Sequence, residues 1–240
     1  MSQKRTVRRF APLNAASHDG SSPPLKGIVF DMDGTLCEPQ NHMFTAMRKA
    51  FDIPKSVDIL EHIHSLPEDE QPAAHGKIEA IERDAMREQV PSAGLVQLLE
   101  CLDRHKIRKA ICTRNFDTPV THLLTTHVPG HIDAFSPVIT RGFRPPKPSP
   151  AGILHIAKAW GVVPESDTLP ENGKKHPDIP LIMVGDSIDD IVAGYEAGAL
   201  TVLLKSPGKE DLEEDERTHV AVDRLDDLVE LLESGLTSRS

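Results

Sequence analysis

Short apolar runs alternate with segments of helical periodicity along most of the chain. Runs with the length and continuity of buried strands lie at 27–31, 109–114, 136–140, 181–186 and 201–204, and a weaker run lies at 219–222. Continuous apolar strands are typical of a parallel sheet that is covered on both faces. Apolar residues at helical spacing predict helices at 94–105, 118–127, 149–161, 189–199 and 223–234. The alternation predicts an α/β layered domain.

One segment interrupts this alternation after the first strand. Residues 38–90 contain no predicted strand, and two stretches within them, HMFTAMRKAF and AAHGKIEAIERDAMREQ, have the pattern of helices. A stretch rich in proline and acids, SLPEDEQPAA, connects them. We therefore expect a small helical cap over 38–90, inserted into a core formed by 26–37 and 91–235. Residues 161–180 are long for a connection and are interpreted as a surface loop.

The two ends of the chain differ from this pattern. The first ten residues, MSQKRTVRRF, carry four cations and no acid, and a stretch rich in serine, proline and alanine follows. We interpret 1–25 as a disordered basic arm. Two alternatives stay open: a mitochondrial transit segment, or a stretch RRFAPL that folds back onto the domain. Residues 236–240 are expected to be a tail.

Composition and charge exclude several classes of function. The net charge is −10, which argues against a nucleic-acid binder, because phosphate backbones require concentrated lysine and arginine. No apolar run approaches the roughly 18 residues of a membrane span. The three cysteines form neither a metal-binding spacing nor an even disulfide set, which favours a reducing compartment. We expect a cytoplasmic monomer whose partner is a small phosphorylated metabolite.

Polar residues follow several of the predicted strands. In an open parallel sheet, the carboxyl ends of the strands face a shared crevice in which ligands bind. Residues at or shortly after these ends are Asp31, Asp33, Thr113, Arg114, Asn115, Lys147, Asp186, Asp189 and Asp190. Clustered carboxylates require protonation or a cation, and an all-oxygen acidic cluster suits Mg²⁺. Magnesium in turn favours phosphate substrates.

These residue types are suited to phosphate chemistry. Asp31 can attack phosphorus and form an aspartyl-phosphate, which divides one difficult step into two easier ones. Asp33 is placed to protonate the leaving oxygen and then to deprotonate water. Lys147 supplies a mobile charge and Thr113 a hydroxyl donor. The candidate substrate-binding residues are Thr113, Arg114, Asn115 and Lys147.

Four short motifs, DMDGT, CTRN, KPSP and GDSIDD, occur in this order, each at a predicted strand end or in the loop that follows it. Together they resemble the haloacid dehalogenase superfamily over residues 26–235. The resemblance implies a three-layer, Rossmann-like core with a central parallel sheet and a helical cap. It implies a nucleophile at Asp31, an acid/base at Asp33 and phosphate contacts from Thr113 and Lys147. It also implies that Asp31, the backbone carbonyl of Asp33, Asp186 and Asp190 hold Mg²⁺, with Asp189 as a substitute for Asp190.

Each of these residues also has a structural explanation. Asp189 suits a helix N-terminus, Asn115 suits a helix cap, and Lys147 alone resembles a solvated loop lysine. Arg141 and Arg144 are compatible with a second anion or with simple surface charge. Within the superfamily, hydrolysis of a small phosphate monoester, as in phosphoglycolate phosphatase-like enzymes, is the first hypothesis. A phosphosugar mutase and a non-catalytic phosphate-binding protein are the alternatives.

Overall fold

The core of the protein is a six-stranded parallel sheet. The computed structural model describes residues 10–14, 22–169 and 174–237. The strands lie in the order β3-β2-β1-β4-β5-β6, and every neighbouring pair is parallel. Their bounds are β1 Gly27–Phe30, β2 Arg108–Cys112, β3 Val138–Ile139, β4 Leu181–Gly185, β5 Leu200–Leu204 and β6 Val220–Val222. The predicted strand at 136–140 is thus two residues long, and the weak run at 219–222 does form a strand.

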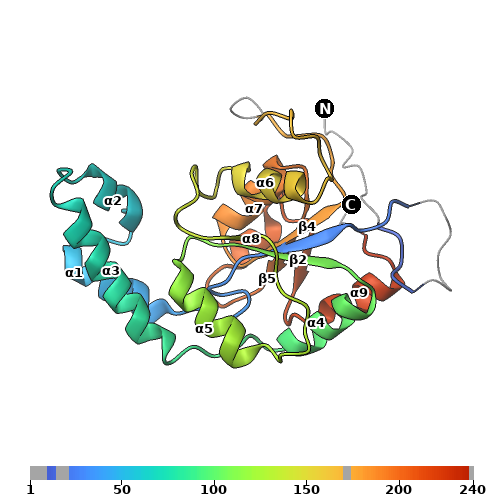
Figure 1. Ribbon diagram of the computed structural model, residues 1–240, viewed down its shortest axis with the longest axis horizontal. Helices are drawn as coiled ribbons and strands as arrows, with labels where there is room; N and C mark the ends of the chain where they lie inside the picture. The colour runs from blue at the N-terminus through green and yellow to red at the C-terminus, as the bar shows by residue number, and fades with distance from the viewer. Residues whose placement is uncertain (1–9, 15–21, 170–173, 238–240) are drawn as a thin grey trace.

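Side chains of alternate strand residues pack into two separate hydrophobic clusters, one on each face of the sheet. In β1, Ile28 and Phe30 belong to one buried cluster, and Val29, between them, belongs to the other. The first cluster is covered by α4 Leu95–Arg104, α5 Asp117–His127 and α9 Asp227–Ser234. The second is covered by α6 Ala151–Ala159 and α7 Ile188–Glu196, on the opposite side of the sheet (Figure 1). This arrangement confirms the predicted three-layer α/β core.

The cap follows β1 and contains three helices rather than the two expected. They are α1 Asn41–Phe51, α2 Ile59–Ser65 and α3 Gln71–Met86, and they share a small core of their own. The short helix α2 was not predicted because its seven residues contain only three apolar side chains, Ile59, Leu60 and Ile63, too few to establish a helical period. A further short helix, α8 Glu210–Glu214, has no buried residue and was likewise not expected.

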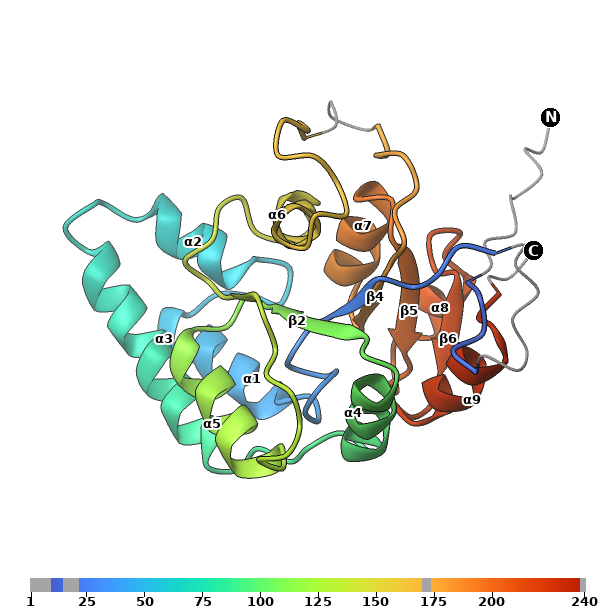
Figure 2. The same cartoon turned by 45° about the vertical axis from the view of Figure 1, so that its right-hand side comes forward.

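The N-terminal segment packs on the core where a disordered arm was expected. Phe10 and Ala11 are buried, and the Phe10 N–H donates to the Leu236 carbonyl at 2.8 Å. The Leu13 N–H donates to the Leu232 carbonyl at 2.9 Å, so this segment lies along the end of α9 (Figure 2). Leu236 is itself buried, so the core extends into the expected tail. The predicted arm is therefore wrong for residues 10–14 and for Leu25, which is buried in the same core cluster. Residues 1–9 and 15–21 lie outside the described part.

In the described segments, no helix combines the length and the apolar character that crossing a bilayer requires.

Candidate active site

The sheet register places the ends of three central strands side by side. The last residue of β1, Phe30, is paired with Ile111 of β2 and Val184 of β4. Asp31 therefore emerges between the residues that follow β2 and the end of β4, and its N–H still donates to the Val184 carbonyl at 2.9 Å. Thr113 and Asp186 follow these neighbouring strands, and both are buried. The topology thus brings these three side chains to one edge of the sheet.

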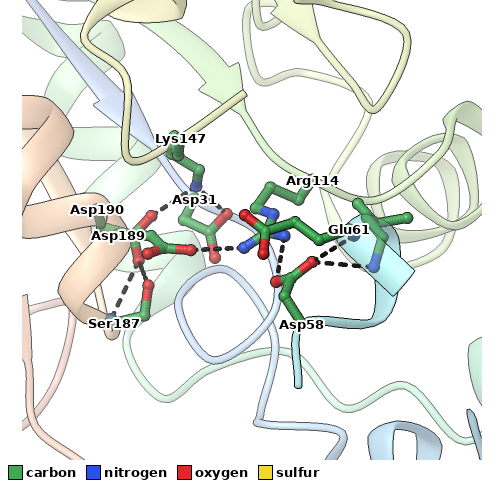
Figure 3. Close-up of polar contacts among 9 residues, drawn as sticks. Asp31, Asp58, Glu61, Arg114, Lys147, Ser187, Asp189 and Asp190 are labelled. Atoms are coloured by element: carbon green, nitrogen blue, oxygen red, sulfur yellow. Dashed lines mark hydrogen bonds and ion pairs between the residues drawn. The ribbon is translucent and has the colours of Figure 1, made fainter. Parts of the chain in front are cut away.

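Lys147 lies at the centre of the acidic cluster. Its Nζ is 2.5 Å from a carboxylate oxygen of Asp31 and 2.5 Å from one of Asp190 (Figure 3). Lys147 is only 5% exposed, although a lysine in such a proline-rich loop is expected to be solvated. Ligand oxygens of Asp31, Asp186 and Asp190 all lie within 4.8 Å of one another. The cluster therefore combines three carboxylates with one buried ammonium group.

The two adjacent acids of the last motif have different partners. Asp190 is fully buried and uses its second oxygen to accept hydrogen bonds from the Ser187 N–H, at 3.0 Å, and the Ser187 hydroxyl, at 2.6 Å. This capping box at the start of α7 holds the carboxylate in place. Asp189, by contrast, points to Arg114 at 2.5 Å (Figure 3). The structure therefore places Asp190 in the acidic cluster and Asp189 outside it.

The turn after Asp31 requires glycine at position 34. Gly34 has a φ of +83°, in the region that side chains rarely adopt. A Cβ atom built there would overlap the Asp186 carboxylate. The glycine of the DMDGT motif thus allows the β1 turn to approach Asp186 closely.

Asp33 is held beside the cluster by Asn115. The Asn115 side-chain amide donates to an Asp33 carboxylate oxygen at 2.8 Å, and the Asn115 N–H donates to the Thr113 hydroxyl at 3.1 Å. Burial raises the pKa of Asp33, and the hydrogen bond from Asn115 opposes that rise. Asn115 therefore positions both Asp33 and Thr113, besides accepting from the Phe116 N–H at the start of α5.

The charges of the cluster are incompletely balanced, which fits a divalent cation. Burial, together with the nearby Asp190 and Asp186, raises the pKa of Asp31 to about 8 even though Lys147 opposes the rise. Burial and Asp190 raise the pKa of Asp186 to about 6, against the effect of Lys209. Carboxylates with raised pKa values are costly to ionise, and a bound cation would reverse that cost. The donor set consists of oxygen atoms only, as Mg²⁺ prefers.

Lys209 is a cluster residue that the sequence analysis missed. It follows β5, and its Nζ donates to the Asp186 carboxylate and to the Asp186 backbone carbonyl, the latter at 2.9 Å. The signal was available, because the same search of strand ends, if continued past 201–204, leads to this lysine.

A cavity of about 710 Å³ opens above the cluster, and residues of both the core and the cap line it. Three core arginines contact the cap, and two of them, Arg114 and Arg141, also line this cavity. Arg114 lies 2.7 Å from Asp58, Arg141 forms an ion pair with Glu82, and Arg144 lies 2.7 Å from the Nε2 atom of His64. Neither of the roles left open for Arg141 and Arg144, a second anion or simple surface charge, included these contacts, in which each arginine meets a residue of the cap. The sequence alone does not predict these cap residues as partners of the arginines, because each pair joins segments that are distant in the chain.

Asp58 is the N-cap residue of α2 and also forms an ion pair between the cap and the core. One of its oxygens accepts from the N–H groups of Leu60 and Glu61, at 2.9 and 3.0 Å, and the other meets Arg114 (Figure 3). Burial alone would raise the pKa of Asp58, but the hydrogen bonds from Glu61 and Arg114 hold it below its usual value. Arg114 also contacts Asp189, so one guanidinium joins the cap to α7.

We expect Asp58→Asn to weaken the attachment of the helical cap to the core. The N-terminus of α2 should stay intact, because asparagine is an equally good N-cap residue. Losing the partly exposed ion pair should cost about 0.5–1 kcal/mol, and Asp58→Ala about 1 kcal/mol more. Hydrogen exchange of the α1–α3 amides measures the effect. Asp52→Asn, which removes a charge elsewhere in the cap, serves as the control. Exchange in Asp58→Asn that matches the wild type would show that the ion pair does not hold the cap.

Comparisons with known proteins agree with this geometry. A family model described as haloacid dehalogenase-like hydrolase matches residues 25–198. An uncharacterized hydrolase of Saccharomyces cerevisiae is 42% identical over 214 residues, which cover 88% of this chain and 92% of the yeast protein. A haloacid dehalogenase-like hydrolase domain-containing protein of Arabidopsis thaliana is 34% identical over 197 residues, covering 77% of this chain and 73% of the plant protein.

Solved structures share the fold at lower identity. A family IA, variant 3 hydrolase of Entamoeba histolytica superposes with a TM-score of 0.65 at 19% identity, covering 87% of this chain and 99% of that one. A Lactobacillus plantarum protein provisionally assigned as a phosphoglycolate phosphatase gives a TM-score of 0.64 at 16% identity, covering 86% and 99%. Both likenesses cover more than four fifths of this chain.

Proposed function

The chain belongs to the haloacid dehalogenase-like hydrolase family, and from that premise we propose that it hydrolyses a phosphate monoester through Asp31 with the help of Mg²⁺. One observation carries the proposal: Asp31 meets Lys147 at 2.5 Å within a cluster that also holds Asp186 and Asp190, at the base of a cavity. This arrangement supports a carboxylate nucleophile that approaches a phosphoryl group beside concentrated positive charge.

In the first step, an Asp31 oxygen attacks phosphorus and the bond from phosphorus to the leaving oxygen breaks. Asp33 donates its proton to that oxygen, a role that suits an acid whose pKa burial has raised. In the second step, Asp33 accepts a proton from water as the water attacks the phosphorus of the aspartyl-phosphate. Inorganic phosphate leaves, and Asp31 returns as a carboxylate.

Charge around the phosphoryl group comes from several residues of the chain. Lys147 is held charged, because Asp190 and Asp31 raise its pKa although burial opposes this. Thr113 lines the same cavity and offers a hydroxyl donor. The residues that would hold Mg²⁺ are Asp31, Asp186 and Asp190, with the backbone carbonyl of Asp33. The bound ion would neutralise these carboxylates and polarise the phosphoryl group.

Hydrolysis of a generic aryl phosphate tests this proposal. We expect release of inorganic phosphate with Mg²⁺, its loss on addition of EDTA, and its recovery when Mg²⁺ is restored in excess. Incubation with a hexose 1-phosphate separates the alternatives, since a mutase would yield an isomer in place of free phosphate. Inactivity toward a broad panel of phosphate monoesters with Mg²⁺ would favour a non-catalytic phosphate-binding protein and contradict the proposal.

A further inference from the structure

The cavity above Asp31 extends well beyond the space that a phosphoryl group needs. Its volume of about 710 Å³ lies within the range of pockets that enclose drug-sized ligands. The cap side is largely apolar, and one of its aromatic side chains, Phe44, is 37% exposed. The apolar residues on this side are Met43, Phe44, Met47, Ile59, Leu60 and Ile78. This wall suits the body of an organic molecule and offers little to a phosphate ion alone.

The cations that line the cavity fall into two groups. In the first group, each core cation has a carboxylate partner: Lys147 has Asp31 and Asp190, Lys209 has Asp186, Arg114 has Asp58 and Asp189, and Arg141 has Glu82. These pairs account for every carboxylate of the lining except Asp33, which accepts from Asn115. Each acid of the cavity wall therefore has a partner, although one Glu82 oxygen and the Nη1 atom of Arg141 are buried without a hydrogen bond of their own.

The second group consists of Arg48 and Lys55, both from the cap. Throughout the described ranges, neither has a carboxylate within ion-pair distance, and both line the cavity. The Nε atom of Arg48 is buried without a hydrogen-bond partner, and one terminal nitrogen reaches only the Phe44 carbonyl, at 3.4 Å. A buried donor without a partner is costly, and an anion in the cavity would satisfy it.

We propose that the preferred substrate carries an apolar body and a second anionic group, which Arg48 and Lys55 bind while the scissile phosphate meets Asp31. This inference rests on the proposed phosphatase activity and adds the class of substrate to it. The shared chemistry of the second group is its negative charge, which a carboxylate or a phosphonate can supply. The apolar side chains of the cap that line the same cavity would contact the body of this substrate.

Matched aryl phosphates test the inference. The parent is phenyl phosphate, and its derivatives carry para chains of increasing length that end in a carboxylate, a phosphonate or a neutral carboxamide. We expect kcat/KM of the wild type to favour at least one charged derivative over its carboxamide by about tenfold, as one charge-assisted contact would give. The ratio should fall toward one in Arg48→Gln and Lys55→Gln. Lys49→Gln, which neighbours Arg48 but does not line the cavity, should keep the ratio.

Using the ratio of two substrates cancels losses that come from partial misfolding, since these lower both rates alike. If the wild type hydrolyses phenyl phosphate but treats charged and neutral derivatives equally at every length, the inference is wrong and the proposed function stands. A ratio that Arg48→Gln and Lys55→Gln leave unchanged also overturns it. If phenyl phosphate and all its derivatives resist hydrolysis, the proposed function itself fails.

Discussion

Asp31→Asn is expected to lower turnover of a phosphate monoester by on the order of 10⁴-fold or more, the scale seen when a covalent nucleophile is removed. The amide has nearly the shape of the carboxylate but cannot attack phosphorus. Steady-state release of phosphate from an aryl phosphate with Mg²⁺ measures the loss. Asp178→Asn, which removes a surface carboxylate paired with Lys175, provides the control and should retain wild-type turnover.

The same variant should fold at least as well as the wild type. Burial and two neighbouring carboxylates raise the pKa of Asp31 to about 8, so ionising it at neutral pH costs folding free energy. A neutral amide removes that cost, and Lys147 keeps Asp190 as a partner. A melting temperature equal to or above that of the wild type would separate a chemical defect from a structural one. Turnover above a few per cent of wild type in Asp31→Asn would contradict the role of Asp31.

Lys147→Met is expected to damage both activity and stability. Removing the ammonium group takes away charge beside the phosphoryl group, which should lower kcat by about 10²–10³-fold. It also leaves two buried carboxylates without their shared partner, which should lower the free energy of unfolding by about 3 kcal/mol. Denaturant unfolding in EDTA and kcat with Mg²⁺ measure the two effects separately.

The matched control for this variant is Lys175→Met. Lys175 pairs with Asp178 at 3.0 Å, but both side chains are substantially exposed. Exposed pairs contribute about 0–1 kcal/mol, so this variant should unfold almost as the wild type does. Equal destabilisation by the two substitutions would show that burial does not set the value of the Lys147 contacts.

The sequence was sufficient to predict the core because the relevant signals are local. Continuous apolar strands identified the parallel sheet, and the residues that follow them identified the acidic edge. The choice between Asp189 and Asp190 could not be made in this way, because it depends on which side of α7 faces the cluster. In the structure, the Ser187 capping box turns Asp190 inward and leaves Asp189 to Arg114.

Features that join distant segments were less predictable. The contacts of Asp58 and Glu82 with core arginines depend on how the cap sits on the core, which no local pattern encodes. Phe10 was assigned to a disordered arm because basic residues precede it and a stretch rich in serine and proline follows. Its burial depends on Leu236, more than two hundred residues away. Burial of a single aromatic residue in such a context leaves no periodic signal.

The central claim is that Asp31 carries the phosphoryl group, and chemical trapping tests it most directly. Wild-type protein turning over an aryl phosphate with Mg²⁺ is quenched in acid, and half the sample is treated with borohydride, which reduces an acyl phosphate to an alcohol. Mass spectrometry of the peptides should find phosphate on the peptide containing position 31, and homoserine at that position after reduction. Neither mark should appear in Asp31→Asn. Rapid wild-type turnover with no phosphate at position 31, or with phosphate on another carboxylate, would contradict the account.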